Sequence, residues 1–504
     1  SENRNYFHWE LEFPKVFFGE REGFDAVVGN PPYARIQSLK EHFPETAEYY
    51  NGKFKSSTQN FDIYANFTEK GWNLLDREGL LGYIEPHKFF QARMGEGLRK
   101  LLSENRAIHQ ITTFGEHQVF QEASVYTCIL ILSKKSQEKL KYREVNPQRI
   151  KLGEKIEHYE IEADYGPDKW IFNNPKTKSV LEKIDQQNST LKDITRKIFV
   201  GLQTSADNIY LLEKIEEPEN GTVKVRDQVS GEKWEIETGM LKPILKGDDV
   251  HRYQPSEPRY WVIFPYNISG EGAEFIEPDS VRNNYPKTWE YLKEHESDLR
   301  GREDGKMDRE DWYAYVYPKN LDEFEKDRVI TPYASYGSNF TYSPSGMYHN
   351  TKVYSIVLNQ DTKISEKYLL SILNTDILWY YISNTGYVLR GGYFTFTTDY
   401  IEPFSVPEIQ FKMDEKERNN KVENLKTEFR NDRKIDVFQL SDEVKHDFLV
   451  YLSERMMSLN EKLNSLNLNI IDYLGSYDEG KALNDLYNPA SGVSDTPLTD
   501  TASD

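Results

Sequence analysis

Four consecutive residues near the start of the chain, Asn30-Pro31-Pro32-Tyr33, have the chemistry needed to hold a planar amino group. The side-chain carbonyl of Asn30 and the backbone carbonyl of Pro31 are two hydrogen-bond acceptors, and proline restricts the backbone so that both keep their direction. Two acceptors suit an –NH₂ group, and the ring of Tyr33 offers a flat face for stacking. Taken alone, such a tetrapeptide is more typical of a rigid turn.

The residues around this tetrapeptide predict an α/β fold that places it at the edge of a sheet. Apolar runs predict four strands, at residues 24–30, 80–86, 107–115 and 124–132, the last two forming a hairpin. Two helices are expected between the strands, one from the N-cap Asp62 to near Gly79 and one over 95–105. This order is half of a doubly wound sheet, a fold that binds ligands at the carboxyl ends of its strands. The context therefore favours a functional site at Asn30.

Composition limits the classes of function that fit the chain. Its 504 residues predict two or three domains, and its single cysteine, Cys128, allows no internal disulfide and is expected in the core. No apolar run reaches the length of a membrane span, and no signal peptide opens the chain, so a cytoplasmic protein is expected.

The charge of the chain bears on nucleic acid as a partner. A net charge of −20 counts modestly against DNA, although phosphate binding depends on local patches. One such patch is expected in the linker-like residues 134–155, which carry eight Lys or Arg and three Glu. Acidity therefore does not exclude DNA.

The segments around these residues resemble the gamma class of N6-adenine DNA methyltransferases, specifically type IIG restriction-modification and phage-defence enzymes. The catalytic blocks of that family resemble residues 7–17, 24–37, 61–102 and 119–132. Its target-recognition domain resembles residues 201–212, 241–253, 368–382 and 391–409. The likeness covers roughly residues 5–410, and the catalytic blocks are the more specific part.

The resemblance implies site-specific DNA adenine-N6 methylation with S-adenosylmethionine. The target adenine would be flipped out of the duplex into a catalytic site formed by Asn30, Pro31, Pro32 and Tyr33. Its amino group would donate hydrogen bonds to Asn30 and to the Pro31 carbonyl. Tyr33 would stack on the base, and Phe120 would contact its other face or edge.

The cofactor-binding half of that family is not recognisable in the chain. The glycine-rich turn and the acidic residue that hold S-adenosylmethionine precede the Asn-Pro-Pro-Tyr motif in the family, and here the chain starts at Ser1. We therefore expect a carboxy-terminal fragment that is inactive alone and binds the cofactor poorly. A nuclease, if the full-length protein has one, is expected in the absent part, and no metal site is expected.

The organisation predicted from these observations has four parts. Residues 1–140 are expected to be the second half of a Rossmann-like methyltransferase sheet, and 141–410 a mixed α+β target-recognition domain. Residues 411–475 are expected to be helical, with an apolar stripe that packs a helix pair, and 476–504 a disordered polar tail. In the recognition domain, side chains able to reach bases are Arg196, Lys197, Gln203, Lys246, Arg252 and Arg390.

Three other interpretations remain open from the sequence. The chain could be a DNA-binding specificity module without catalysis, an RNA adenine methyltransferase, or a protein-glutamine methyltransferase, which also holds a planar amide with this motif. The last interpretation leaves about 270 residues after the sheet unexplained.

Overall fold

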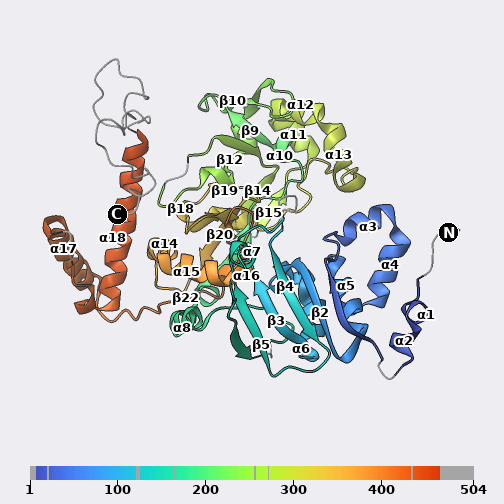
Figure 1. Ribbon diagram of the computed structural model, residues 1–504. Coiled ribbons are helices and arrows are strands. Elements are labelled where there is room, and N and C mark those ends of the chain that lie inside the picture. The colour runs from blue at the N-terminus through green and yellow to red at the C-terminus, as the bar shows by residue number, and fades with distance from the viewer. Residues whose placement is uncertain are drawn as a thin grey trace, which may run out of the picture.

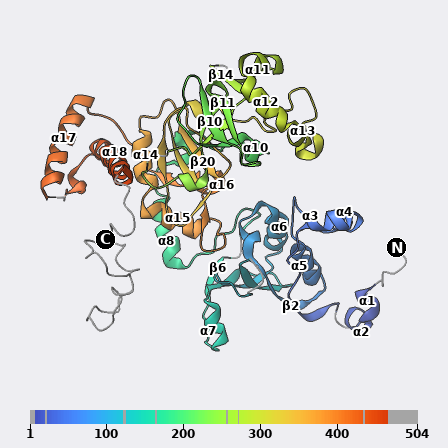
Figure 2. The same cartoon turned by 90° about the horizontal axis from the view of Figure 1, so that it is seen from above.

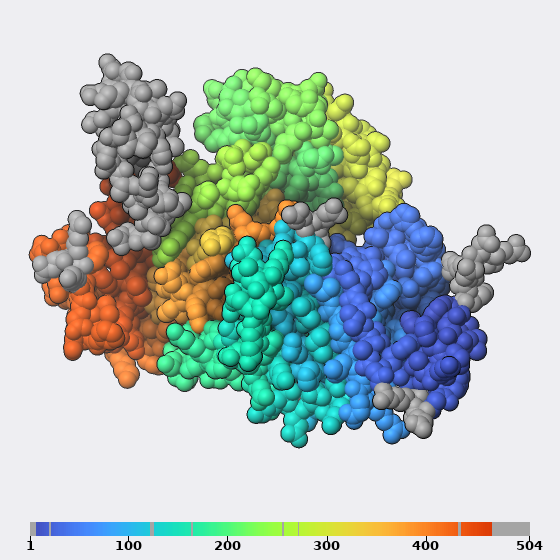
Figure 3. Space-filling view, viewed as in Figure 1, coloured from blue at the N-terminus to red at the C-terminus, as the bar shows by residue number. Residues whose placement is uncertain are grey.

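The computed structural model describes residues 7–19, 22–120, 125–162, 165–254, 257–270, 272–432 and 435–465. The amino-terminal part and the central part pack side by side, and the carboxy-terminal helices lie at the side opposite the first helices (Figures 1, 2 and 3). None of the described helices has the length and apolar character needed to cross a membrane.

A six-stranded mixed sheet, in the order β1-β2-β4-β3-β5-β6, forms the amino-terminal part. Its strands are β1 (Phe24–Gly29), β2 (Leu75–Pro86), β3 (Ile108–Thr113), β4 (Thr127–Ser133), β5 (Lys139–Glu144) and β6 (Tyr159–Glu162). β1 is parallel to β2, and β4 is antiparallel to both β2 and β3. Strands β1, β2 and β3 therefore end at the same edge of the sheet.

Helices connect these strands and cover the sheet. They are α1 (Trp9–Glu12), α2 (Pro14–Phe17), α3 (Ile36–His42), α4 (Pro44–Lys53), α5 (Tyr64–Asn73), η1 (His87–Phe90), η2 (Arg93–Gly95), α6 (Glu96–Glu104) and α7 (Pro147–Lys151). Leu98, Leu101 and Leu102 recur at helical spacing on α6 and are buried with Trp72 of α5 and Leu130 of β4 in one core. Each buried leucine stabilises this packing by roughly 1.5–3 kcal/mol.

The central part contains a six-stranded and a four-stranded sheet. The first has the order β11-β10-β9-β13-β12-β19, and its strands are β9 (Leu211–Lys214), β10 (Thr222–Arg226), β11 (Lys233–Glu237), β12 (Leu241–Leu245), β13 (Tyr260–Ile263) and β19 (Tyr348–His349). The second has the order β18-β16-β20-β8, with β8 (Thr195–Val200), β16 (Arg328–Pro332), β18 (Thr341–Ser343) and β20 (Val353–Leu358).

The helices of the central part are α8 (Pro175–Ile184), α9 (Leu191–Ile194), α10 (Asp207–Tyr210), α11 (Pro278–Asn284), α12 (Pro286–Glu294), α13 (Glu296–Gly305), α14 (Glu366–Leu373), α15 (Asp376–Thr385) and α16 (Thr398–Ile401). Buried Arg302 ties α13 to the neighbouring loops, because its guanidinium donates hydrogen bonds to the carbonyls of Leu299, Thr204, Trp312 and Ala314. The central part also contains three two-stranded sheets: β14 (Tyr266–Ser269) with β15 (Gly272–Phe275), β17 (Ala334–Ser335) with β21 (Phe394–Thr395), and β7 (Ser189–Thr190) with β22 (Ser405–Val406).

The predicted fold class is confirmed: an α/β sheet is followed by a mixed region and a helix pair. The order of the sheet adds a detail, because β4 is inserted between β2 and β3 and completes the expected hairpin. The first sheet also continues beyond residue 140, since β5 and β6 pair into it and Trp170 and Phe172 pack in its core. We propose that the first domain ends after Phe172.

Two local expectations were wrong. Residues 134–155 are not a linker, because β5 and α7 belong to the first sheet region, and several of their cations interact within the chain: Lys139 pairs with Glu160 and Arg149 with Glu154. The helix expected from Asp62 to near Gly79 is shorter at both ends: Asp62 does not cap α5, which begins after Ile63 without a side-chain cap, and α5 ends at Asn73 because β2 begins at Leu75.

The carboxy-terminal helices α17 (Glu415–Asp432) and α18 (Asp442–Ser465) form a pair, as expected. Only the first residue of the predicted stripe, Leu452, packs in the contact between them, whose buried core is Val422, Leu425, Val444 and Phe448. The next three residues of the stripe, Met456, Leu459 and Leu463, are each more than 40% exposed. Leu466, Ile470 and the polar tail 476–504 lie outside the described residues.

Candidate functional site

The Asn-Pro-Pro-Tyr segment leaves the sheet directly after β1 and continues to α3 without regular structure. Pro31 is buried, whereas Asn30 is exposed, and within the described residues no hydrogen bond engages the Asn30 side chain. Its amide oxygen is therefore an acceptor available to a ligand.

Tyr33 is fixed by its hydroxyl, which donates a hydrogen bond of 3.0 Å to the carbonyl of Ile84 in β2. Burial raises the pKa of Tyr33 to about 12, with smaller contributions from Glu85 and Cys128. The phenol therefore stays protonated at neutral pH, and its ring is held in one orientation beside Asn30.

The segment that follows Tyr33 is tied to the first residues before α5. Backbone hydrogen bonds join Ile36 to Phe61 and Ile63 to Ala34. The buried carboxylate of Asp62, in the middle of this pairing, forms an ion pair with the ammonium of Lys88. Lys88 lies just after β2, so the ion pair connects the loops that follow two neighbouring strands.

A buried acid lies beneath the Asn-Pro-Pro-Tyr segment. Glu85, near the end of β2, is fully buried, and burial raises its pKa to about 8. Its Oε2 atom is 2.6 Å from the hydroxyl of Thr68 on α5, and its Oε1 atom has no hydrogen-bond partner among the described residues.

The hydrogen-bond geometry agrees with a protonated Glu85. The Thr68 hydroxyl has one proton and two acceptors within reach, the carbonyl of Tyr64 at 3.0 Å and Oε2 of Glu85 at 2.6 Å. Both contacts are hydrogen bonds at the same time when Glu85 is protonated and donates to the hydroxyl.

Phe120 lies in the loop that joins β3 to β4, at the same edge of the sheet as Asn30. It is partly buried, and no ring contact joins it to Tyr33 within the described part of the chain. The structure thus brings both aromatic residues to the edge where β1, β2 and β3 end. The role of Phe120 in holding a base stays a prediction.

The residues named as DNA contacts occupy different environments. Lys197 and Gln203 line one hollow of about 330 Å³, together with Tyr317 and Lys319. Arg390 is exposed, in the loop between α15 and β21. These three side chains are placed where a partner could reach them.

The other three candidates interact within the chain. Arg196 forms an ion pair of 3.1 Å with Glu323. Lys246 lies 3.5 Å from the ring centre of Tyr260. Arg252 donates a hydrogen bond to the carbonyl of Asn374. Each would have to exchange a partner in order to read a base, and their role as DNA contacts stays a prediction.

Reasoning from the sequence missed Glu85 and the pair of Asp62 with Lys88. A charged residue that ends an apolar run, as Glu85 does in LLGYIEP, is the signal that could have identified the buried acid. No group of three or more His, Cys, Asp or Glu side chains suitable for a metal ion occurs in the described ranges.

Comparison with protein families gives two matches along the chain. Residues 1–120 match the family described as Eco57I restriction-modification methylase. Residues 242–406 match the TaqI-like C-terminal specificity domain. The two matches overlap the segments that resemble the catalytic blocks and the target-recognition domain, and they confirm the resemblance to restriction-modification methyltransferases.

Individual proteins agree with these matches. The type II restriction enzyme and methyltransferase RM.Eco57I of Escherichia coli is 30% identical over 412 residues, which are 77% of this chain and 40% of that protein. The type II methyltransferase M.BstVI of Geobacillus stearothermophilus is 21% identical, over 78% of this chain and 69% of that protein. The chain thus spans less than half the length of the first of these relatives.

Among solved structures, the type IIL restriction-modification enzyme MmeI in complex with DNA superposes with a TM-score of 0.48 and 13% identity. That superposition covers 86% of this chain and 54% of the other.

Proposed function

From a chain that carries an Eco57I-type restriction-modification methylase segment and a TaqI-like specificity domain, we propose a site-specific DNA adenine-N6 methyltransferase. It would act within a type II restriction-modification or related phage-defence enzyme. The observation that carries this proposal is the Asn30 amide, which is exposed and without a partner among the described residues, at the end of β1 and beside a tyrosine held by its hydroxyl. We refer to residues 30–33 as the adenine clamp.

The adenine clamp suits an amino group on an aromatic ring. The adenine has to leave the duplex first, which costs roughly a few kcal/mol of stacking and pairing. Asn30 Oδ1 and the Pro31 carbonyl would then accept hydrogen bonds from the two N6–H groups, and the face of Tyr33 would hold the ring. Two acceptors on one nitrogen favour a pyramidal amine, whose lone pair turns out of conjugation and becomes nucleophilic. No nucleophilic Ser or Cys is needed, in keeping with the burial of Cys128.

The residues present do not fit the whole of S-adenosylmethionine, the methyl donor that the family implies. The groove beside β1 is lined by the rings of Trp9, Phe13 and Phe67, and its described lining includes no carboxylate for ribose hydroxyls. In the described chain β1 pairs only with β2, and Val28 on it is 85% exposed. We propose that a further polypeptide segment covers this edge and completes the donor site.

Double-stranded DNA is the proposed substrate. The hollow with Lys197 and Lys319 offers two cations on the surface of the specificity part, and Gln203 adds a side chain able to pair with a base edge. Because the chain is acidic overall, we expect binding to depend on such local cations and to weaken steeply with salt.

The test is Asn30→Ala, made in a protein that contains the segment completing the donor site, with transfer of a labelled methyl group to duplex DNA as the readout. We expect methylation to be abolished while DNA affinity stays within about twofold, since the clamp acts after the base has left the duplex. Asn51→Ala, an exposed asparagine on α4, is the matched control. Unchanged methylation in Asn30→Ala would refute the clamp. A variant that folds but no longer binds DNA would assign the segment to DNA binding alone.

A further inference from the structure

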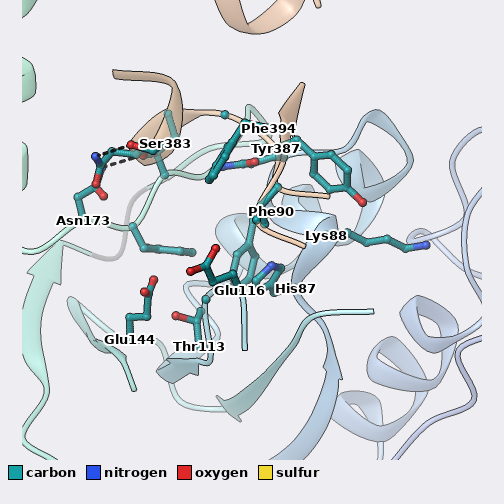
Figure 4. Close-up of a pocket in the computed structure, with 18 of the residues that line it drawn as sticks. His87, Lys88, Phe90, Thr113, Glu116, Glu144, Asn173, Ser383, Tyr387 and Phe394 are labelled. Atoms are coloured by element: carbon teal, nitrogen blue, oxygen red, sulfur yellow. Dashed lines mark hydrogen bonds between the residues drawn. The ribbon is translucent and has the colours of Figure 1, made fainter. Parts of the chain in front are cut away.

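A second cavity, of about 400 Å³, lies where the amino-terminal and central parts meet (Figure 4). None of the adenine-clamp residues lines it. A hydrogen bond between the two parts borders it: the side-chain amide of Gln91 donates to the carbonyl of Thr385. The cavity therefore exists only because the two parts are docked.

Aromatic rings from both parts line this cavity. On the side of the central part, Trp379 contacts Tyr336 and Phe394, with ring centres 5.6 and 5.5 Å away. Tyr336 is 70% exposed, so its ring is available for stacking. On the other side, Phe90 and Phe172 form a buried apolar floor with ring centres 5.0 Å apart. The exposed ring of Tyr336 and its neighbour Trp379 offer flat faces on which a planar ring can stack.

Two carboxylates face the aromatic side. In Figure 4, Glu116 and Glu144 lie on one side of the cavity, and Phe394 lies on the opposite side. Each carboxylate lies against a glycine with a positive φ: a Cβ on Gly392 would be 2.6 Å from Glu116, and one on Gly115 would be 2.7 Å from Glu144. A side chain at either position would meet a carboxylate, so the two glycines leave room for both carboxylates to lie here.

The remaining polar groups set the charge of the cavity. His87 Nδ1 is buried and has no partner within the described residues, and burial lowers the pKa of His87 to about 4, so the ring is neutral at physiological pH. Lys88 points away from the cavity (Figure 4), and its ammonium pairs with Asp62. Burial raises the pKa of Glu144, the exposed His117 in the lining opposes this shift, and Glu116 adds to it. The described lining contains no other Lys and no Arg. The cavity thus attracts hydrogen-bond donors, and a phosphate would stay outside it.

We propose that this interdomain cavity is a nucleobase site that selects guanine. Guanine is the one DNA base with two adjacent N–H donors on its pairing edge, at N1 and N2, and a carboxylate accepts both at once. Glu116 provides that carboxylate, Glu144 lies beside it, and the rings of Trp379 and Tyr336 stack on the base. This inference goes beyond adenine methylation, and it can be wrong even if the methylation proposal is right.

The base can come from two sources, which share this chemistry. One is a guanine that leaves the duplex next to the methylated adenine, because the cavity lies beside the loops that follow β2 and β3. The other is a free guanine nucleotide that binds where the two parts dock.

The experiment compares guanosine monophosphate with inosine monophosphate, which differs only by the missing N2 amino group, in calorimetric titrations of the whole chain. We expect guanosine monophosphate to bind at least about tenfold more tightly, because one of the two donors to Glu116 is lost in inosine. Glu116→Gln should lower the affinity by about the same factor, since an amide offers one acceptor only. Glu104→Gln, an exposed glutamate on α6, should bind as the wild type does.

The outcomes separate the proposal from its alternatives. Equal affinity for the two nucleotides, or no binding of either at millimolar concentration, would overturn the guanine site, and this arm requires neither DNA nor methylation. If a duplex containing guanine displaces bound guanosine monophosphate and a duplex of A·T pairs does not, the occupant is a base from DNA. If both duplexes leave the nucleotide bound, the occupant is a free nucleotide.

Discussion

Glu85→Gln tests whether the acid beneath the adenine clamp is neutral in the folded protein. Its pKa of about 8 compares with 4.5 for an exposed glutamate, so ionising it in place costs roughly 4–5 kcal/mol. Glutamine keeps the shape and can donate its amide hydrogen to the Thr68 hydroxyl, as the protonated acid does. The substitution therefore removes the titration and preserves the packing.

The sign of the effect of pH on stability depends on whether the folded or the unfolded chain releases the Glu85 proton first. Below about pH 4.5 the carboxyl is protonated in both states, and its contribution to stability is fully present. As pH rises from about 4.5 to about 8, the unfolded chain loses the proton while the folded chain keeps it, so stability falls by up to about 1.4 kcal/mol per pH unit. Above about pH 8 the carboxyl is ionised in both states, so stability falls no further. The other titratable groups that face Glu85 are Tyr33, Tyr64, Tyr83 and Cys128, and burial raises the pKa of each, so they stay neutral over this range.

Native-state hydrogen exchange of peptides from β2 and α5 measures this pH-dependent loss of stability. The method reports the free energy of local opening around Glu85, which unfolding of the whole multi-domain chain would not isolate. We expect equal protection of the two proteins at about pH 4, where the carboxyl is protonated in both the folded and the unfolded chain. By pH 8.5, the Gln variant should be more protected by several kcal/mol, after correction for intrinsic exchange rates. Glu104→Gln should follow the wild type at every pH. If wild type and Glu85→Gln lose protection with the same pH slope, Glu85 is ionised in the fold and the argument from the Thr68 proton fails.

Three further predictions follow from particular contacts. Lys88→Met leaves the buried Asp62 carboxylate unpaired and should lower stability by roughly 3–5 kcal/mol in thermal melts; a loss below about 1 kcal/mol would show that water replaces the ammonium. Arg302→Met leaves four carbonyls without their donor and should cost a similar roughly 3–5 kcal/mol in urea unfolding, whereas an unchanged midpoint would mean that α13 does not depend on this arginine. In selection from random duplexes, the chain should enrich a motif containing adenine, and Lys197→Ala should reduce the slope of log K against log salt by about 1; no retained DNA at low salt would contradict the proposed substrate.

Local sequence was sufficient for the elements near the adenine clamp. Short apolar runs bounded by glycine, proline or polar residues predicted β1 and β2, because strand formation there depends on residues adjacent in the chain. Asn-Pro-Pro-Tyr was likewise readable in sequence, since proline limits the backbone of the residues it joins wherever they are placed. The hairpin of β3 and β4 was predicted for the same reason, as its strands are close in sequence.

Contacts between distant residues were not readable in this way. Asp62 has the residue type of a helix cap, yet its partner is Lys88, because burial of a carboxylate is tolerated only beside a cation and the fold brings that lysine to it. The neutrality of Glu85 depends on α5 and β4 closing over it, and the interdomain cavity requires side chains between residues 87 and 394 to meet. Residue type and spacing thus indicated which chemistry this chain could perform. Desolvation and docking, which act across hundreds of residues, set its charge states and form the interdomain cavity.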